Sequence, residues 1–324
     1  MQDKAQVRKT LKKQQYGFSG GHTAVKICTW TKRSLLNRDV CYKQVFYGIQ
    51  AHLCCQMSPS VNYCQNSCIF CWRSFADTKG FDEIPRDLAD KPEAIIEKSF
   101  SQQRKLLSGF GGNEKVSLEK LKQAQNPKHF AISLTGEPTL YPFLPELIEA
   151  LHKRGITTFV VTNGLNPGML KKIFPTQLYQ SVSAPDEKTF LEIEKPKIKS
   201  AWNLFNESLG VMSEKRNSKT RTCLRITLIK GINDFAPERY AQLIKSANPL
   251  FVEVKSYMHV GSSIYRLEKT NMPLHNDIKE FAGKISAFCE WKPADEKKES
   301  RVVLLMKPED HGKRFLKDFS NISV

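Results

Sequence analysis

Short apolar runs alternate with amphipathic stretches from about residue 90 to the end of the chain. A short apolar run between polar residues predicts a buried strand, whereas apolar positions that recur every three or four residues predict a helix. The predicted strands are His129–Leu134, Thr157–Thr162, Tyr179–Ser183, Leu224–Ile229, Phe251–Ser256 and Val302–Met306, with a further strand around Gln56–Asn62. The predicted helices are Pro92–Leu107, Leu144–Arg154, Glu187–Glu194 with Ala201–Met212, Pro237–Ala247 and Pro273–Phe288.

This alternation is typical of βα units arranged around a parallel sheet. A length of 324 residues suits either two domains or one α/β barrel. Six or seven βα units are too few for a closed eight-stranded barrel. We therefore predict an α/β fold with an open, partial (β/α)6-type TIM barrel. A doubly wound sheet is the alternative, because periodicity does not separate the two arrangements.

The first part of the chain differs in composition from the barrel-like remainder. Residues 1–26 are polar and basic and contain two consecutive glycines, so we predict an extended or mobile basic arm. Residues 27–324 are predicted to form one domain, with a cysteine-rich segment at 27–55 and the barrel core and C-terminal elements at 56–324.

The charge and the apolar runs narrow the class of protein. Fifty Lys and Arg against 33 Asp and Glu give a net charge of +17, which attracts polyanions such as nucleic acids without identifying one. A basic protein with no nucleic-acid partner is the ordinary alternative. Met1–Gln15 lacks the apolar centre of a signal peptide, and runs such as Val302–Met306 are too short to span a membrane. We expect an intracellular, cytoplasmic protein.

Seven of the nine cysteines lie between residues 28 and 71, a density that indicates metal ligands in an intracellular chain. Cys64, Cys68 and Cys71 form a C-x3-C-x2-C loop. Three thiolates on such a loop can bind three irons of a [4Fe–4S] cluster and leave the fourth iron open. A structural zinc site needs four ligands, usually in two pairs, and does not match this spacing. Three unliganded thiols are the remaining alternative.

The cysteine loop followed by βα units resembles the radical S-adenosylmethionine (SAM) superfamily, whose open iron binds the amine and carboxylate of SAM. Residues 135–138, Thr-Gly-Glu-Pro, are similar to the Gly-Gly-Glu-Pro motif that holds the methionine amine, with Thr in place of the first Gly. Residues 162–164 and 181–183 each end a predicted strand, where barrel sites form; alone, each could be a turn or a helix cap. The resemblance implies that the cofactor-binding residues are Thr135, Gly136, Glu137, Pro138, Thr162, Asn163 and Ser183.

Three upstream cysteines narrow the resemblance further. Cys28, Cys41 and Cys54 are separated by twelve residues each time. This pattern, together with the sequences at 41–49, 68–73, 134–142 and 225–233, resembles the archaeal-type tRNA 4-demethylwyosine synthases along nearly the whole chain. The resemblance implies a second [4Fe–4S] cluster on these three cysteines, with structural thiols as the alternative. Cys55 has no assigned role, and the spacing favours its neighbour as the ligand.

The family resemblance implies a carbon–carbon lyase reaction of radical SAM chemistry. N1-methylguanosine beside the anticodon of tRNA(Phe) is condensed with two carbons of pyruvate to give tricyclic 4-demethylwyosine. Lys43, two residues from Cys41, is the implied catalytic residue, because a neutral amine can form a Schiff base with pyruvate. An ion-pairing lysine is the alternative. We expect an external electron donor, a monomer and no flavin domain, because no glycine-rich phosphate loop precedes Cys28.

Several basic and aromatic residues are candidates for contact with tRNA. Trp72 and Arg73, beside Cys71, are candidates for the pocket of the target base, which must leave its stack to react. The candidate phosphate contacts are Arg8, Lys9, Lys12 and Lys13 in the arm, and Lys215, Arg216, Lys219 and Arg221 in a predicted loop at 213–222. Such charge runs are equally often solvated surfaces without a partner.

Two other functions remain open at this stage. Another two-cluster radical SAM enzyme would act on a different RNA base or on a small substrate. A non-catalytic RNA-binding protein with structural zinc would bind no SAM, and it would leave Glu137 and Asn163 without a role.

Overall fold

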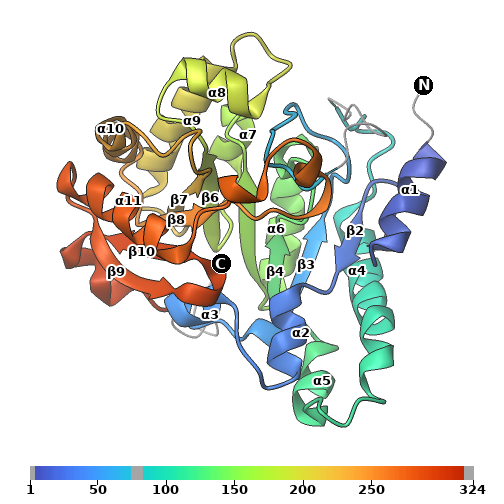
Figure 1. Cartoon of the computed structure of the whole chain (residues 1–324). Helices are drawn as coiled ribbons and strands as arrows, with labels where there is room; N and C mark the ends of the chain where they lie inside the picture. The colour runs from blue at the N-terminus through green and yellow to red at the C-terminus, as the bar shows by residue number, and fades with distance from the viewer. Residues whose placement is uncertain (1–3, 74–82, 317–324) are drawn as a thin grey trace.

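The computed structural model describes residues 4–73 and 83–316, which form one ten-stranded sheet with helices around it (Figure 1). The strand order is β1-β2-β3-β4-β5-β6-β7-β8-β10-β9, so β1 and β9 are the edges of an open sheet. The six central strands are parallel: β3 Cys54–Ser58, β4 His129–Ile132, β5 Thr157–Thr162, β6 Gln177–Val182, β7 Arg221–Leu228 and β8 Phe251–Ser256. The flanking strands are antiparallel: β1 Gly17–Phe18, β2 Ala24–Lys26, β9 Lys292–Lys297 and β10 Val302–Met306.

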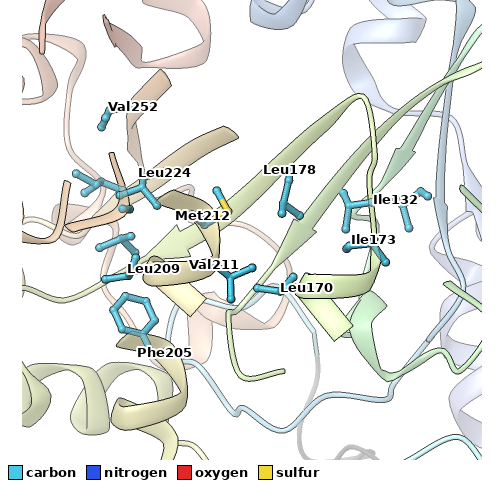
Figure 2. Packing of buried hydrophobic residues seen from close by; sticks show 14 of the residues in the cluster. Ile132, Leu170, Ile173, Leu178, Phe205, Leu209, Val211, Met212, Leu224 and Val252 are labelled. Atoms are coloured by element: carbon cyan, nitrogen blue, oxygen red, sulfur yellow. The ribbon is translucent and has the colours of Figure 1, made fainter. Parts of the chain in front are cut away.

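Helices connect the parallel strands and cover the outer face of the sheet. The described helices are α1 Lys4–Lys13, α2 Thr29–Leu35, α3 Tyr42–Tyr47, α4 Pro92–Leu107, α5 Leu118–Ala124, α6 Leu144–Lys153, α7 Pro167–Lys172, α8 Glu187–Glu194, α9 Ala201–Lys215, α10 Pro237–Ala247 and α11 His275–Ala287. Figure 2 shows the outer core, where Leu178 of β6 and Leu224 of β7 face α7 and α9. The predicted open (β/α)6 barrel is confirmed.

The opposite, concave face of the sheet has a separate core. Successive strand residues point to opposite faces, so Phe159 and Tyr179 lie on the concave face while their neighbours Val160 and Leu178 join the outer core. Helix α3 packs on the concave face through Tyr42, Phe46 and Tyr47, all of which are buried. The segment between Cys28 and Cys54 therefore closes the barrel interior from one side.

The predicted extended arm at residues 1–26 is wrong for residues 4–26. Residues 4–13 form α1, and β1 and β2 extend the sheet beyond β3. Leu11 and Tyr16 pack with Val61 and Leu134, which lie just beyond the carboxyl ends of β3 and β4. The arm contains too few apolar residues to show this pattern, because their partners come from distant parts of the chain. The domain boundary at residue 26 stays a prediction.

Two further elements differ from the sequence pattern. Val302–Met306 is a strand as predicted, but it runs antiparallel to β8 and ends the series of βα units. Its partner β9, with the sequence Lys-Pro-Ala-Asp-Glu-Lys, is too polar to be predicted as a strand. The short helices α1, α2, α3, α5 and α7 were also missed. In the described part of the chain, every helix is too short or too polar to cross a membrane.

A buried ion pair joins the concave face to α3. The Glu253 carboxylate, which has no exposed surface, accepts hydrogen bonds from Arg225 Nε at 3.0 Å and from the hydroxyls of Tyr42 and Tyr47 at 3.0 and 2.6 Å. Removing one partner of a buried pair leaves the other charge uncompensated, which is costly.

We expect Glu253→Ala to lower the free energy of unfolding by about 3–5 kcal/mol, because the Arg225 guanidinium would remain buried without its partner. Urea denaturation followed by circular dichroism measures the change. Glu280→Ala is the matched control, since Glu280 pairs with Lys284 on the exposed surface of α11 and should change stability by less than about 1 kcal/mol. Equal losses in the two variants would contradict this account of the ion pair.

Candidate active site

The cysteine loop leaves the carboxyl end of β3 and runs along the end of α8. The Ser67 and Ile69 amides donate to the carbonyls of Glu194 and Ile193 at 3.0 and 2.9 Å, and the Lys197 amide donates to the Gln65 carbonyl at 3.0 Å. These backbone bonds hold the loop that carries Cys64, Cys68 and Cys71 at the carboxyl edge of the sheet.

The Thr-Gly-Glu-Pro motif follows β4 and packs against the same loop. Gly136 has a φ of +73°, and a Cβ there would lie 1.9 Å from the Ser60 carbonyl oxygen, so only glycine fits. The Glu137 amide donates to the Tyr63 carbonyl at 2.7 Å. Thr135 occupies the first position of the motif, and its carbonyl accepts a hydrogen bond from the Ser58 hydroxyl.

The Glu137 carboxylate collects hydrogen bonds from several neighbouring groups. It accepts from the Thr162 hydroxyl and the Asn163 amide, each at 2.8 Å, and from the Thr139 amide and hydroxyl at 3.1 and 2.8 Å. Burial raises its pKa above the usual range, although these bonds oppose that shift. All these donors are neutral, so a bound ammonium group would supply a positive charge that they do not.

Asn163 joins this carboxylate to the cysteine loop. Its side-chain amide lies 4.0 Å from Cys64 Sγ and donates to Gln65 Oε1 at 3.3 Å. The structure therefore brings together the predicted residues of the Thr-Gly-Glu-Pro motif, of the segment 162–164 and of the cysteine loop.

Glu194 is a site residue that the sequence did not indicate. Its carboxylate accepts from Cys68 Sγ at 2.6 Å and from Asn66 Nδ2 at 2.8 Å. Ser183 also donates to it, and Ser181, rather than Ser183, is among the residues that line the cavity. Glu194 ends a helix without any motif, so no local signal could have found it.

A cavity of about 170 Å³ lies between these groups, lined by the three cysteines together with Glu137, Asn163 and Trp72. Burial raises the pKa of Cys64 to about 12 and that of Cys68 well above its usual range, so thiolates here need positive charge from a bound group. Among the described residues, no three Cys, His, Asp or Glu side chains are grouped closely enough for a single metal ion. A cluster spreads its ligands over separate irons, and the three cysteines fit that arrangement.

The upstream cysteines lie near one another on the concave side. Cys28 and Cys41 precede the first turns of α2 and α3, and Cys54 begins β3. Burial raises the pKa of Cys41 to about 11, and burial followed by the Cys28 thiolate raises that of Cys54. Cys55 points the other way and is fully buried in the outer core, which separates it from the group.

Lys43 lies on α3 beside this cysteine group. Its amine is 4.8 Å from the ring centre of Phe159 and 4.7 Å from that of Tyr179. Burial, reinforced by the Arg225 charge, lowers the pKa of Lys43, while Glu253 and the nearby thiols act in the opposite direction. The surroundings therefore favour a neutral, nucleophilic amine more than water does.

The candidate tRNA contacts near the site differ in exposure. Trp72 is 37% exposed and lines the cavity. Arg73 is buried and donates to the carbonyls of Asn62 and Asn66 at 3.4 and 2.9 Å, so it braces the cysteine loop, which argues against contact with tRNA. On α1, Arg8 lies over the Phe18 ring, whereas Lys9, Lys12 and Lys13 are exposed.

The basic run at 215–221 lies before β7, at the amino edge of the sheet. The Lys215 amine donates to the Ile173 carbonyl at 2.9 Å, Arg216 pairs with Asp310, and Arg221 donates to the Arg314 carbonyl. The predicted solvated loop is wrong for these three residues, and Lys219 is the exposed member of the run.

Comparison with known proteins agrees with this geometry. The family model of the radical SAM superfamily matches residues 58–244, and the model of wyosine base formation matches residues 246–307. The tRNA 4-demethylwyosine synthase of Pyrococcus abyssi is 47% identical over 93% of this chain and 89% of that protein. The synthase of Methanocaldococcus jannaschii is 43% identical over 93% of this chain and 95% of that protein.

A solved structure gives the same result in three dimensions. It is described as TYW1 with a lysine–pyruvate adduct bound, and it superposes with a TM-score of 0.85 at 39% identity over 98% of this chain and 99% of that chain. These relatives cover 93% to 98% of the chain. The chain therefore belongs to the S-adenosyl-L-methionine-dependent tRNA 4-demethylwyosine synthase family of radical SAM enzymes.

Proposed function

We propose that this enzyme condenses N1-methylguanosine in tRNA(Phe) with two carbons of pyruvate to form 4-demethylwyosine. The family establishes a SAM-dependent tRNA-modifying enzyme with a [4Fe–4S] cluster; the methylated base, the pyruvate and a second cluster belong to the proposal.

One observation carries the proposal. Lys43 contacts Phe159 and Tyr179, while the cavity at the cysteine loop is lined by Val161 and Ser181. Phe159 and Val161 are two positions apart on β5 and therefore lie on the same face of the strand. Tyr179 and Ser181 are related in the same way on β6. Two residues of strand span about 7 Å. The Lys43 amine, which can react with a ketone, therefore lies about two strand residues from the cavity that the three cysteines and Glu137 line, toward the amino ends of β5 and β6.

We assign the residues roles by their chemistry. Cys64, Cys68 and Cys71 would hold the first cluster, which together with SAM supplies a 5′-deoxyadenosyl radical. Glu137 would bind the methionine amine, with Thr162 and Asn163 orienting its carboxylate. The remaining members of the motif shape this turn: Gly136 allows the close approach to Ser60, and Pro138 begins the turn that follows.

The concave face would hold pyruvate. Cys28, Cys41 and Cys54 would bind the second cluster, which would supply an open iron able to bind pyruvate. The Lys43 amine would attack the ketone carbon, with loss of water, to form a Schiff base. The lysine–pyruvate adduct in the description of the related TYW1 structure supports this role.

The tRNA would approach the carboxyl edge. Lys9, Lys12 and Lys13 on α1 are exposed there and suit phosphate contacts, and Trp72 suits a base outside its stack. An external electron donor, a monomeric enzyme and a cytoplasmic site of action complete the proposal.

The decisive experiment incubates the anaerobically reconstituted enzyme with SAM, a reductant, carbon-labelled pyruvate and tRNA that contains N1-methylguanosine. Mass spectrometry of the nucleosides should show a tricyclic guanosine with two labelled carbons, together with 5′-deoxyadenosine. If 5′-deoxyadenosine forms without that nucleoside, the radical chemistry stands and the substrate assignment falls, which would favour a different RNA base or a small substrate.

The two cysteine groups should account for separate sets of iron. With two [4Fe–4S] clusters we expect about eight irons per chain, reduced to about four in either Cys64→Ala or Cys41→Ala. Cys55→Ala is the matched control in the same strand as Cys54 and should keep all the iron, since Cys55 faces the outer core. Iron analysis of reconstituted protein tests this; an unchanged iron content in Cys41→Ala would remove the second cluster from the proposal.

Lys43→Ala should retain both clusters and SAM cleavage but lose the modified nucleoside, because the Schiff base cannot form. Borohydride reduction in the presence of labelled pyruvate should trap label on the peptide that contains Lys43. Lys255→Met is the matched control, since Lys255 is a partly buried lysine with its pKa lowered by burial to about 8, and its removal should leave the trapped adduct in place. Near-normal product from Lys43→Ala would show that the Schiff base is not needed.

A further inference from the structure

An exposed apolar surface lies at the mouth of the candidate active site and has no role in the chemistry described above. It is formed by the segment between β8 and α11, where the side chains of Met258, Val260, Ile264 and Tyr265 are all exposed. Tyr265 is 83% exposed, an unusual environment for a large aromatic ring beside a reaction site. We call residues 258–265 the aromatic segment.

The backbone of the aromatic segment is held firmly against the cysteine loop. The Ser262 amide donates to the Trp72 carbonyl at 2.8 Å, and Arg266 Nε donates to the Ile69 carbonyl at 3.0 Å. Gly261 has a φ of +60°, and a Cβ there would lie 2.6 Å from the Trp72 carbonyl oxygen. In Figure 1 the orange turn between β8 and α11 lies beside the light-blue loop after β3. An exposed ring on a well-bonded backbone, Tyr265, can accept a planar group.

A basic loop meets a different stretch of the same cysteine loop. Residues 195–199, Lys-Pro-Lys-Ile-Lys, follow α8, and all three lysines are exposed. Pro196 forms a β-bridge with Asn66, and the Lys197 amide donates to the Gln65 carbonyl at 3.0 Å. Residues 195–199, which we call the lysine loop, thus contact residues 65–67 of the cysteine loop. The aromatic segment and the adjoining Arg266 contact residues 69–72 of the same loop.

Positive charge also lies beside Trp72 itself. The Lys26 amine is 5.8 Å from the centre of the Trp72 ring and 4.7 Å from that of Tyr16. Burial, together with the nearby Lys32 charge, lowers the pKa of Lys26. Aromatic faces interleaved with amines are the chemistry that binds unpaired RNA, in which bases stack on rings and phosphates meet lysines.

We propose that the aromatic segment and the lysine loop together hold the unpaired nucleotides that flank the target base. A base next to the target stacks on Tyr265, beside the target base at Trp72, and the phosphates of the flanking nucleotides meet Lys195 and Lys199. The inference rests on the proposed function, because it assumes that the substrate is a tRNA loop. A protein partner would need only the apolar side chains, whereas the lysines and the net charge of +17 favour a polyanion.

The test measures the affinity of the reconstituted full-length enzyme for N1-methylguanosine-containing tRNA over a range of salt concentrations. Tyr265→Ala should weaken binding about tenfold with no change in salt dependence, because stacking carries no charge. Tyr265→Phe should bind like wild type, since it keeps the ring. Lys195→Ala combined with Lys199→Ala should reduce the slope of log affinity against log salt by about 1.4, the loss expected for two phosphate contacts to a single strand.

Matched controls lie away from the mouth. Phe288→Ala removes a half-exposed ring just after the end of α11, and Lys172→Ala with Lys245→Ala removes two exposed lysines on the outer helices α7 and α10. Both should bind tRNA like wild type, and all variants should still cleave SAM in the absence of tRNA. If the control variants lower the affinity or the salt slope as much as the test variants do, tRNA binds through the overall positive charge of the protein and the proposal is overturned.

The remaining outcomes separate this inference from the proposed function. Failure of the wild-type enzyme to bind or modify the tRNA would overturn the proposed function itself. Normal modification by wild type, with unchanged tRNA affinity in Tyr265→Ala, would overturn only the present inference. If Tyr265→Ala binds tRNA normally but loses turnover with a protein electron donor and not with dithionite, the surface docks that protein instead.

Discussion

The candidate site depends on a close backbone contact between two loops at the carboxyl edge of the sheet. Gly136 lies so near the Ser60 carbonyl that no side chain fits between them, and the next residue donates its amide to Tyr63. Because β3 and β4 are adjacent and parallel, the loops that leave them start from the same edge. This contact places the carboxylate of Glu137 beside the cysteines, and the rest of the cavity is arranged around that pair of loops.

Burial on the concave face determines the charge states of the groups that would do the chemistry. A low-dielectric interior disfavours charge, so it lowers the pKa of Lys43 and raises the pKa of the Cys41 and Cys54 thiols. The same burial that favours a nucleophilic amine therefore favours the protonated form of these thiols. Helix α3 produces this environment, and Glu253 holds that helix in place by accepting from Tyr42 and Tyr47.

The distribution of basic residues shows where local sequence is a poor guide. Arg73 was a candidate for the pocket of the target base and Lys215 for a phosphate contact, yet both are buried with backbone carbonyls as acceptors. The lysine loop at residues 195–199 has no sequence motif that predicts a role, yet it is exposed beside the cysteine loop. Lys215 is buried because its amine meets the Ile173 carbonyl, which lies 42 residues away along the chain.

Local patterns by themselves determined the order of the strands and helices along the chain, since the hydrophobic periodicity of a segment depends only on its own residues. Strands β5 and β8 and helices α4, α8 and α10 have the predicted bounds, and the cysteine spacing separated two groups of three. Only the tertiary structure decided that residues 4–13 form a helix, that the polar β9 pairs with β10, and that Glu194 meets Cys68. Each of these outcomes depends on which face is buried and on contacts between distant residues, and a local sequence pattern contains neither.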